Sequence, residues 1–319
     1  MRSTIEASDL GKTFATKAGP VNAVQGVSFK VAAGEVVGLL GPNGAGKTTT
    51  MRMLSTLEQP STGHASVTGH DLRRDPRGVR EAIGLVAQSG GTRPIATARD
   101  ELLLQARLHR LASPETQVRA MIDMFDLAEL ADRQTATLSG GQRRRLDLAI
   151  GLIHAPSVIF LDEPTAALDP PSRNDLWKHV RALRDRTGAT VMLSTHHLDE
   201  ADALCDRVLI LDRGKLIAED SPTHLKQQLG HDIITVDIGA LPDIDGARAR
   251  DILAALPGVQ SVHAQGDEVR VGCRRAEALV SRIVLALHDA DVQVRGLQVT
   301  SPSLDDVFLT LTGHATQEL

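Results

Sequence analysis

One segment of the chain combines glycines with a lysine and a threonine at a spacing typical of phosphate binding, G-x-x-x-x-G-K-[ST]. It follows the apolar run Val36 to Leu40 and precedes a helical stretch, Thr49 to Leu57. The glycines let backbone N–H groups approach phosphates, and the helix N-terminus favours negative charge. We expect Lys47 to bind the β- and γ-phosphates and Thr48 to offer its hydroxyl to Mg²⁺. The nucleotide-binding residues predicted here are Gly41, Pro42, Asn43, Gly44, Ala45, Gly46, Lys47, Thr48 and Thr49.

Two adjacent acids, Asp162 and Glu163, follow a second apolar run, Val158 to Leu161. A buried parallel strand of this kind ends at the edge of the sheet where α/β folds bind ligands. Asp162 fits the aspartate that holds Mg²⁺ through a water, and Glu163 points elsewhere. A carboxylate beside the γ-phosphate can polarise the attacking water as a general base. Together with the phosphate-binding segment, the pair predicts hydrolysis of a nucleoside triphosphate.

A third segment, Leu138 to Gln142, lies between these two and reads L-S-G-G-Q. It looks like the signature sequence of ABC-type ATPases, and four further elements occur in that family's order. They are the adenine-stacking aromatic Phe14, the Q-loop glutamine Gln88, the D-loop aspartate Asp169 and the switch histidine His196. The resemblance covers about residues 4–229. The chain has no tyrosine, so the family's usual tyrosine is absent at position 14, where phenylalanine is expected to stack equally well.

The resemblance implies that two cassettes dock head to tail and enclose two ATP molecules. Each nucleotide would touch Lys47 and Glu163 of one chain and the signature of the other. Ser139 and the backbone N–H of Gly141, at a helix N-terminus, would bind the γ-phosphate across the interface. The signature residues expected at the nucleotide are Ser139, Gly140, Gly141 and Gln142.

The resemblance also assigns roles around the γ-phosphate. His196 would contact the phosphate and steady the attacking water, and Asp169 would couple the two sites. Gln88 would reach the Mg²⁺ and the nucleophile and link them to a helical insertion, where a membrane subunit docks. The catalytic residues implied are therefore Glu163, His196 and Gln88, and the metal site implied comprises Thr48, Gln88 and Asp162.

A finer resemblance is to daunorubicin-resistance-type exporter ATPases. It rests on three segments: Arg143 to Ala149, His197 to Asp202, and Ser303 to Gly313. Such proteins are separate ATP-binding chains that pair with a separate membrane chain and export drugs, antibiotics or lipids. The first segment departs from the commoner family pattern at Arg144 and Asp147, and neither residue is expected to contact ATP. The implied partners are thus a transmembrane permease subunit and a second cassette, expected to be a second copy of this chain.

Composition narrows the choice of partners. The formal net charge of −5 gives no reason to expect nucleic acid, and the basic run at residues 143–145 is interpreted as part of the helix after the signature. No stretch approaches the 18 or more apolar residues of a membrane helix, so another chain would supply the span. We expect the protein at the cytoplasmic face of the membrane, held there through the permease. Cys205 and Cys273 are interpreted as reduced thiols, and the histidines lack the spacing of a zinc site.

The order of elements predicts an α/β fold in two domains. Short apolar runs separated by helices indicate a parallel sheet: Val36 to Leu40, Ile83 to Ala87, Val158 to Leu161, Thr190 to Leu193 and Val208 to Leu211. Three short runs indicate an antiparallel subdomain: Thr4 to Asp9, Val27 to Val31 and Ala65 to Thr68. Helix-period stripes between Arg99 and Arg133 indicate a helical subdomain at about residues 89–152 of a cassette spanning residues 1–229. Residues 230–319 read β-α-β-β-α-β, a small ferredoxin-like α+β domain of accessory or regulatory role, followed by a last helix from Ser303 to Leu311.

Two other classes of function compete with a transporter subunit. One is a soluble ABC ATPase of translation or DNA repair. Translation types resemble two cassettes in one chain, and repair types split the cassette with long coiled coils. Here there is one cassette. The signature follows the glycine-rich phosphate-binding segment, the P-loop Gly41 to Thr48, by about 90 residues. The other class, a regulatory protein without hydrolysis, would be expected to lack Glu163 or His196, and both are present. The C-terminal domain is expected to stabilise the dimer or tune turnover, with a passive appendage as the alternative.

Overall fold

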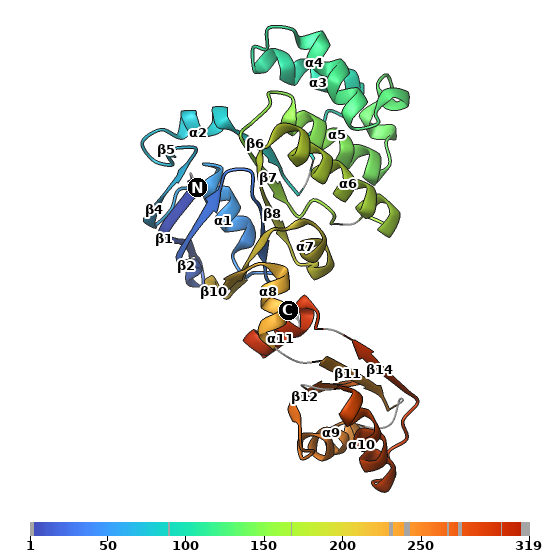
Figure 1. Ribbon diagram of the computed structural model, residues 1–319. Coiled ribbons are helices and arrows are strands. Elements are labelled where there is room, and N and C mark those ends of the chain that lie inside the picture. Colours follow the sequence, from blue (N-terminus) through green and yellow to red (C-terminus); the bar gives the residue numbers. More distant parts are fainter. Residues whose placement is uncertain are drawn as a thin grey trace. The chain divides into compact units, whose positions relative to one another are not determined.

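The computed structural model describes residues 3–88, 90–166, 168–229, 232–238, 243–266, 268–273, 276–300 and 302–313 (Figure 1). The chain forms two compact units, which divide between Pro222 and Thr223. The boundary expected between residues 229 and 230 lies at the far end of helix α8 (Pro222–Leu229), which the second unit includes. None of the helices in these ranges is long and apolar enough to cross a membrane.

A six-stranded sheet forms the centre of the first unit. Its order is β10-β9-β3-β8-β7-β6, and every pairing is parallel except that of the edge strand β10 with β9. The predicted apolar runs all lie in it, whereas β10 was not predicted because its residues alternate between partly buried and exposed. The strands are β3 (Val36–Leu40), β6 (Ile83–Val86), β7 (Val158–Asp162), β8 (Thr190–Thr195), β9 (Arg207–Asp212) and β10 (Lys215–Asp220).

Both faces of this sheet are covered, which explains why its strands read as continuous apolar runs. On β7, Ile159 and Leu161 pack into a core with helices α5 (Gly140–Leu152) and α6 (Pro170–Thr187). Val158 and Phe160 pack into a second core with helix α1 (Lys47–Leu54) and a small antiparallel sheet. The period of two therefore divides β7 between two cores, and β8 is divided in the same way.

The antiparallel sheet has the order β2-β1-β4-β5. Its strands are β1 (Ser3–Thr16), β2 (Gly19–Ala32), β4 (Thr62–Val67) and β5 (His70–Asp71). The expected strands at Thr4 to Asp9 and Val27 to Val31 cover only parts of β1 and β2, whose buried residues also include Leu10 and Val24. The prediction was too short because the rest of this hairpin is largely exposed and polar, so apolar alternation stops there while backbone pairing continues.

The helical subdomain contains α3 (Ala98–Leu108) and α4 (Pro114–Met124), which pack against each other, with α3 also against α5 (Figure 1). The predicted stripe of Val118, Met121, Ile122 and Phe125 is buried, as expected. The stripe on α3 was predicted correctly at Leu102 and Ala106, but Leu108 is 65% exposed. At about 100° per residue, Leu108 lies roughly 240° around the helix from Leu102, so it faces away from the core. The first unit is completed by α2 (Pro76–Ala82) and α7 (Leu198–Leu204).

The second unit confirms the ferredoxin-like prediction. Its antiparallel sheet has the order β12-β13-β11-β14, and α9 and α10 pack into one core on one face of it (Figure 1). The last strand begins at Gly296 rather than at Val292, which lies in a buried turn. The elements are β11 (Asp232–Asp237), α9 (Asp243–Ala254), β12 (Val259–Gln265), β13 (Glu268–Cys273), α10 (Ala276–Asp289), β14 (Gly296–Thr300) and α11 (Leu304–Thr312).

Candidate nucleotide-hydrolysis site

The glycine-rich segment forms a loop between β3 and α1, as predicted. Gly41 and Gly46 have φ values of 149° and 100°, in the region that favours glycine. A Cβ at Gly41 would lie 2.2 Å from the carbonyl oxygen of Leu211, and one at Gly46 would lie 2.5 Å from that of Ala23. Side chains are therefore excluded at both positions, and the loop can follow a tight path around a phosphate.

Lys47, the first residue of α1, is 4% exposed. Its ammonium donates to the carbonyl oxygens of Gly41 at 2.7 Å and Pro42 at 3.0 Å, and lies 3.9 Å from Oε1 of Glu163. Burial lowers the pKa of this ammonium, while the negative charges of Glu163 and Asp162 act in the opposite direction. The cation is thus held inside the loop, where it can turn to a bound polyphosphate.

Asp162 ends β7, with Ser194 of β8 as its register partner. Its Oδ1 accepts hydrogen bonds from Oγ of Ser194 at 2.6 Å and from Oγ1 of Thr48 at 3.1 Å. The structure therefore joins the start of α1 to the end of β7 through a hydroxyl and a carboxylate. Hard oxygen ligands of this kind suit Mg²⁺, which is bound by one or two protein oxygens together with phosphates and waters.

Glu163 is held just beyond the strand with a φ of 44°, which is uncommon outside glycine. Its backbone N–H donates to the carbonyl oxygen of Ser194 at 3.1 Å. Its Oε2 accepts from Nε2 of Gln88 at 3.0 Å, and its Oε1 lies 3.4 Å from Nδ1 of His196. That imidazole nitrogen is buried without a hydrogen-bond partner. The three residues predicted to be catalytic thus meet beside Lys47.

Lys47, Gln88 and Glu163 line a cavity of about 560 Å³, and His196 lies behind Glu163 without lining it. Sequence reasoning missed five of its lining residues, which reach it from the β1–β2 hairpin and from the turn after β9: Val21, Asn22, Ala23, Gln25 and Arg213. Val21 is the register partner of Phe14, so Phe14 lies on the strand next to this rim. The Lys12 ammonium lies 4.9 Å from the centroid of the Phe14 ring. The cavity is completed by Asn43, Gly44, Gly46, Lys47, Thr48, Thr49, Gln88 and Glu163.

The signature lies at the start of α5 and lines no part of this cavity. Ser139 is the N-cap: its Oγ accepts from the N–H of Gln142 at 3.3 Å, and Oε1 of Gln142 accepts from the N–H of Ser139 at 3.0 Å. This capping box leaves the helix start exposed at Ser139 and Gly140. Asp169 is the N-cap position of α6 and makes no side-chain cap bond there. The structure thus gathers the P-loop, Gln88, Asp162, Glu163 and His196 at one place, and the signature and Asp169 elsewhere.

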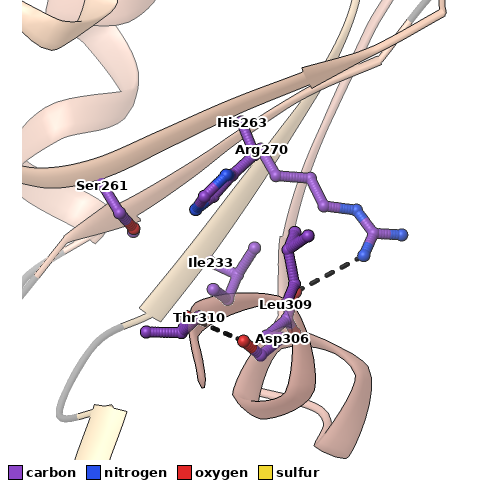
Figure 2. A pocket seen from close by; sticks show the side chains of 8 residues that line it. Ile233, Ser261, His263, Arg270, Asp306, Leu309 and Thr310 are labelled. Carbon is purple, nitrogen blue, oxygen red and sulfur yellow. Dashed lines mark hydrogen bonds and ion pairs between the residues drawn. The ribbon is translucent and has the colours of Figure 1, made fainter. Parts of the chain in front are cut away.

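The second unit has a small hollow between its sheet and α11 (Figure 2). Its volume is about 20 Å³, room for about one water. Nη1 of Arg270 lies 3.4 Å from Oδ1 of Asp306, and Oγ1 of Thr310 donates to the carbonyl oxygen of Asp306 at 2.8 Å. Oδ2 of Asp306 also accepts from the N–H of Ser303 in a capping box, as expected for an acid in a first helical turn. Two of the polar residues that line this hollow, Arg270 and Thr310, therefore both contact Asp306.

Comparisons with known proteins agree with this geometry. The model of the ABC transporter family matches residues 24–166, and that of the C-terminal domain of DrrA1-3-like ATP-binding proteins matches residues 221–312. The daunorubicin/doxorubicin resistance ATP-binding protein DrrA of Streptomyces peucetius is 41% identical, over 98% of this chain and 94% of its own length. The linearmycin resistance ATP-binding protein LnrL of Bacillus subtilis is 32% identical, over 98% of this chain and all of its own length.

A solved structure supports the same conclusion for the first unit. CbiO1 of Clostridium perfringens, part of the ABC transporter complex cbiONQ, has a TM-score of 0.63 and 26% identity. It covers 70% of this chain and 91% of its own length. With the P-loop and Glu163 in one cavity, the chain belongs to the ABC transporter ATP-binding proteins and is an ATP-hydrolysing subunit of an export system.

Proposed function

We propose that the cavity between the P-loop and Glu163 binds ATP as one half of a site, which a second cassette completes with its signature. The observation that carries this proposal is the convergence of Lys47, Gln88 and His196 on the Glu163 carboxylate. The position of the signature is a second argument that the site requires another chain. Ser139 caps an exposed helix start outside the cavity of its own chain, so a γ-phosphate there must be reached from across a head-to-tail interface.

Mg²⁺ fits the residues at the end of β7. Thr48 and Asp162 already share a hydrogen bond, and Gln88 donates to the neighbouring carboxylate. These three residues would hold the ion together with phosphate oxygens and water. The ion would neutralise charge on the phosphates.

Glu163 would then accept a proton from the attacking water. General-base action requires a carboxylate within hydrogen-bond reach of that water and fixed in direction. The hydrogen bond from Gln88 fixes Oε2, and His196 lies on the side of Oε1. Nδ1 of His196 is buried without a partner, so it is available to orient the water or a phosphate oxygen. Asp169 would couple the two sites of the dimer, and Phe14, at the rim, would stack on the adenine.

The cargo we propose is a drug, an antibiotic or a lipid. The support lies in the names of the relatives, which are resistance proteins for daunorubicin/doxorubicin and linearmycin. We also propose that a separate permease subunit carries the cargo and holds this chain at the cytoplasmic face of the membrane, with a second copy of the chain as the other cassette.

Purification of the chain from its native membrane tests this function. We expect a polytopic membrane protein to co-purify and, when both are reconstituted in vesicles, to move an anthracycline only with ATP present. Vesicles with Glu163→Gln should bind ATP and move none. A chain that hydrolyses ATP but co-purifies with no membrane protein would contradict the proposed permease partner.

A further inference from the structure

Arg144 is a buried cation that extends from the signature helix α5 to the active-site edge of the sheet. Its side chain is 6% exposed. Nη1 donates to the carbonyl oxygen of Ala87 at 2.6 Å, Nε to that of Pro164 at 2.7 Å and Nη2 to that of Asp162 at 3.1 Å. Each of its three nitrogens therefore binds a different peptide unit. A planar guanidinium can do this because its donors point outward in fixed directions.

The three carbonyls share one property: each lies next to a residue of the catalytic group. Ala87 precedes Gln88, and Asp162 and Pro164 flank Glu163. Glu163 occupies a backbone conformation that non-glycine residues adopt only when their surroundings hold them there. One side chain thus binds the peptide unit that precedes the general base, the Pro164–Thr165 unit that follows one residue beyond it, and the peptide unit before the glutamine that hydrogen-bonds to it.

The backbone of α5 lies directly on this edge of the sheet. A Cβ at Gly84 of β6 would lie 2.3 Å from the carbonyl oxygen of Gly151 in α5. A Cβ at Gly90, just after Gln88, would lie 2.8 Å from Oδ2 of Asp147, one turn along α5 from Arg144. At Gly84 no side chain separates the two backbones, so a shift of α5 would be transmitted to β6, and at Gly90 it would be transmitted through the Asp147 side chain.

The surroundings of Arg144 favour a cation at this depth. The carboxylates of Asp147, Asp162 and Glu200 act on the guanidinium and oppose the lowering of its pKa by burial. The adjacent Arg145 is less buried and has other hydrogen-bond partners. Arg145 donates at 3.5 Å and 3.3 Å to the carbonyl oxygens of Phe125 and Asp126, which lie in the helical subdomain. Arg145 is therefore a matched control on the same helix.

We propose that Arg144 is a positioning residue for hydrolysis, which links the signature helix to the peptide units that hold Gln88 and Glu163. Docking of Ser139 on a γ-phosphate of the opposite cassette would fix α5, and Arg144 would transmit that constraint to the general base. The inference rests on the proposed head-to-tail site. It assigns a function to a residue that lies outside the nucleotide cavity.

Steady-state ATPase kinetics of Arg144→Gln, Arg144→Lys and Arg145→Gln test this role. Arg144→Gln should lower kcat between about 10- and 100-fold, because a displacement of about 1 Å at a reacting group has effects of that size. KM for ATP and the affinity for a fluorescent ATP analogue should change less than about twofold, since the P-loop is untouched. Arg144→Lys keeps the positive charge but not the planar guanidinium with its several donors. Its kcat should therefore lie between those of the wild type and the glutamine variant. Arg145→Gln should keep the wild-type kcat.

Three results would overturn the inference: a wild-type kcat in Arg144→Gln, an equal loss in Arg145→Gln, or a loss of ATP affinity parallel to that of kcat. If the glutamine variant does not fold, Arg144→Lys decides, and its full activity would also overturn the inference. Glu163→Gln separates this inference from the proposed site. Turnover retained in Glu163→Gln contradicts the proposed site itself, whereas an inactive Glu163→Gln beside a fully active Arg144→Gln contradicts only the role of Arg144.

Discussion

The carboxylate of Glu163 is within reach of an ammonium, an amide and an imidazole, and each contact depends on a different segment of the chain. Lys47 comes from the P-loop, Gln88 from the end of β6 and His196 from the end of β8. The backbone N–H of Glu163 is also bonded to Ser194. The position of the Glu163 carboxylate is therefore determined by the sheet rather than by the local sequence.

Replacement of Glu163 by glutamine tests whether this side chain acts as a general base, because the two side chains have nearly the same size and shape. The amide keeps the size of the side chain and an acceptor for Gln88, but it cannot take a proton from water. We expect kcat to fall by about 100- to 10,000-fold, the usual contribution of a general base, while ATP binding persists. A closed, ATP-loaded dimer should accumulate and be visible by size-exclusion chromatography. Wild-type turnover in this variant would refute the assignment.

Some residues of the site could be predicted from sequence and others could not, for a physical reason. The P-loop, Asp162 and Glu163 are fixed by short-range geometry, because a glycine-rich turn or a strand end needs particular residues at particular spacings. Gln25 and Arg213 reach the cavity only because β2 lies beside the turn after β9: Nε2 of Gln25 donates to the carbonyl oxygen of Arg213 at 2.8 Å. No local pattern records such a contact.

At the scale of elements, the start of α5 has two roles that a pair of substitutions can separate. Ser139 caps the helix, and it is also expected to meet the opposite cassette. Ser139→Arg should leave ATP affinity unchanged, because the residue lies outside the cavity, and should abolish dimer closure and ATPase activity. Ser139→Ala removes the cap, at a cost of about 1 kcal/mol, and the hydroxyl contact with the γ-phosphate, but it adds no bulk and keeps the Gly141 N–H, so closure should be weakened and not abolished. ATP binding and ATP-dependent dimerisation are the measurements, and an active Ser139→Arg would contradict the head-to-tail arrangement.

A stacked pair of imidazoles joins the end of α3 to the segment after α5. The rings of His109 and His154 lie 3.9 Å apart and nearly parallel, and Nε2 of His154 lies 2.9 Å from the carbonyl oxygen of Ile83. Nδ1 of His154 is buried without a hydrogen-bond partner. Burial, together with the neighbouring His109, lowers the pKa of His154. The folded state therefore binds a proton less readily than the unfolded state does.

This lowered pKa predicts how stability depends on pH. The contribution of neutral His154 to the free energy of unfolding is present above the pKa of histidine in the unfolded chain, about 6.5. It is lost as the pH falls through the lower pKa of His154 in the folded state. The free energy of unfolding in urea should therefore decrease between pH 7 and pH 5. His154→Gln, which keeps an N–H for Ile83 but does not titrate, should flatten this decrease. His64→Gln, at an exposed position of β4, should leave the decrease in place, and equal slopes in all three proteins would contradict the prediction.

At the scale of the whole molecule, the two units have separate hydrophobic cores. The core of the second unit consists of residues from β11 to β14 and their two helices, and the two large cores of the first unit contain none of them. The β-α-β-β-α-β order was predictable because helix and strand periods alternate clearly in this part of the chain. The residue at which the second unit begins was not predictable, because helix α8 looks from sequence like the end of the cassette.

Deletion of residues 231–319 tests the role of the second unit. Because the cores are separate, the remaining cassette should fold and bind ATP with an affinity within about twofold of wild type. We expect dimerisation or the ATPase rate to change, as measured by analytical ultracentrifugation and steady-state kinetics. If both stay at wild-type values, the segment is a passive appendage.

The exposed signature has a consequence in genetics. In the proposed head-to-tail homodimer, a mutation of Ser139 would damage the site that uses the partner's P-loop, whereas a mutation of Glu163 would damage the site on its own P-loop. In a cell that makes both mutant chains, each mixed pair would contain one site with both defects and one with neither. Two alleles that are each null alone should therefore complement one another in trans, to the extent that one intact site per pair supports resistance.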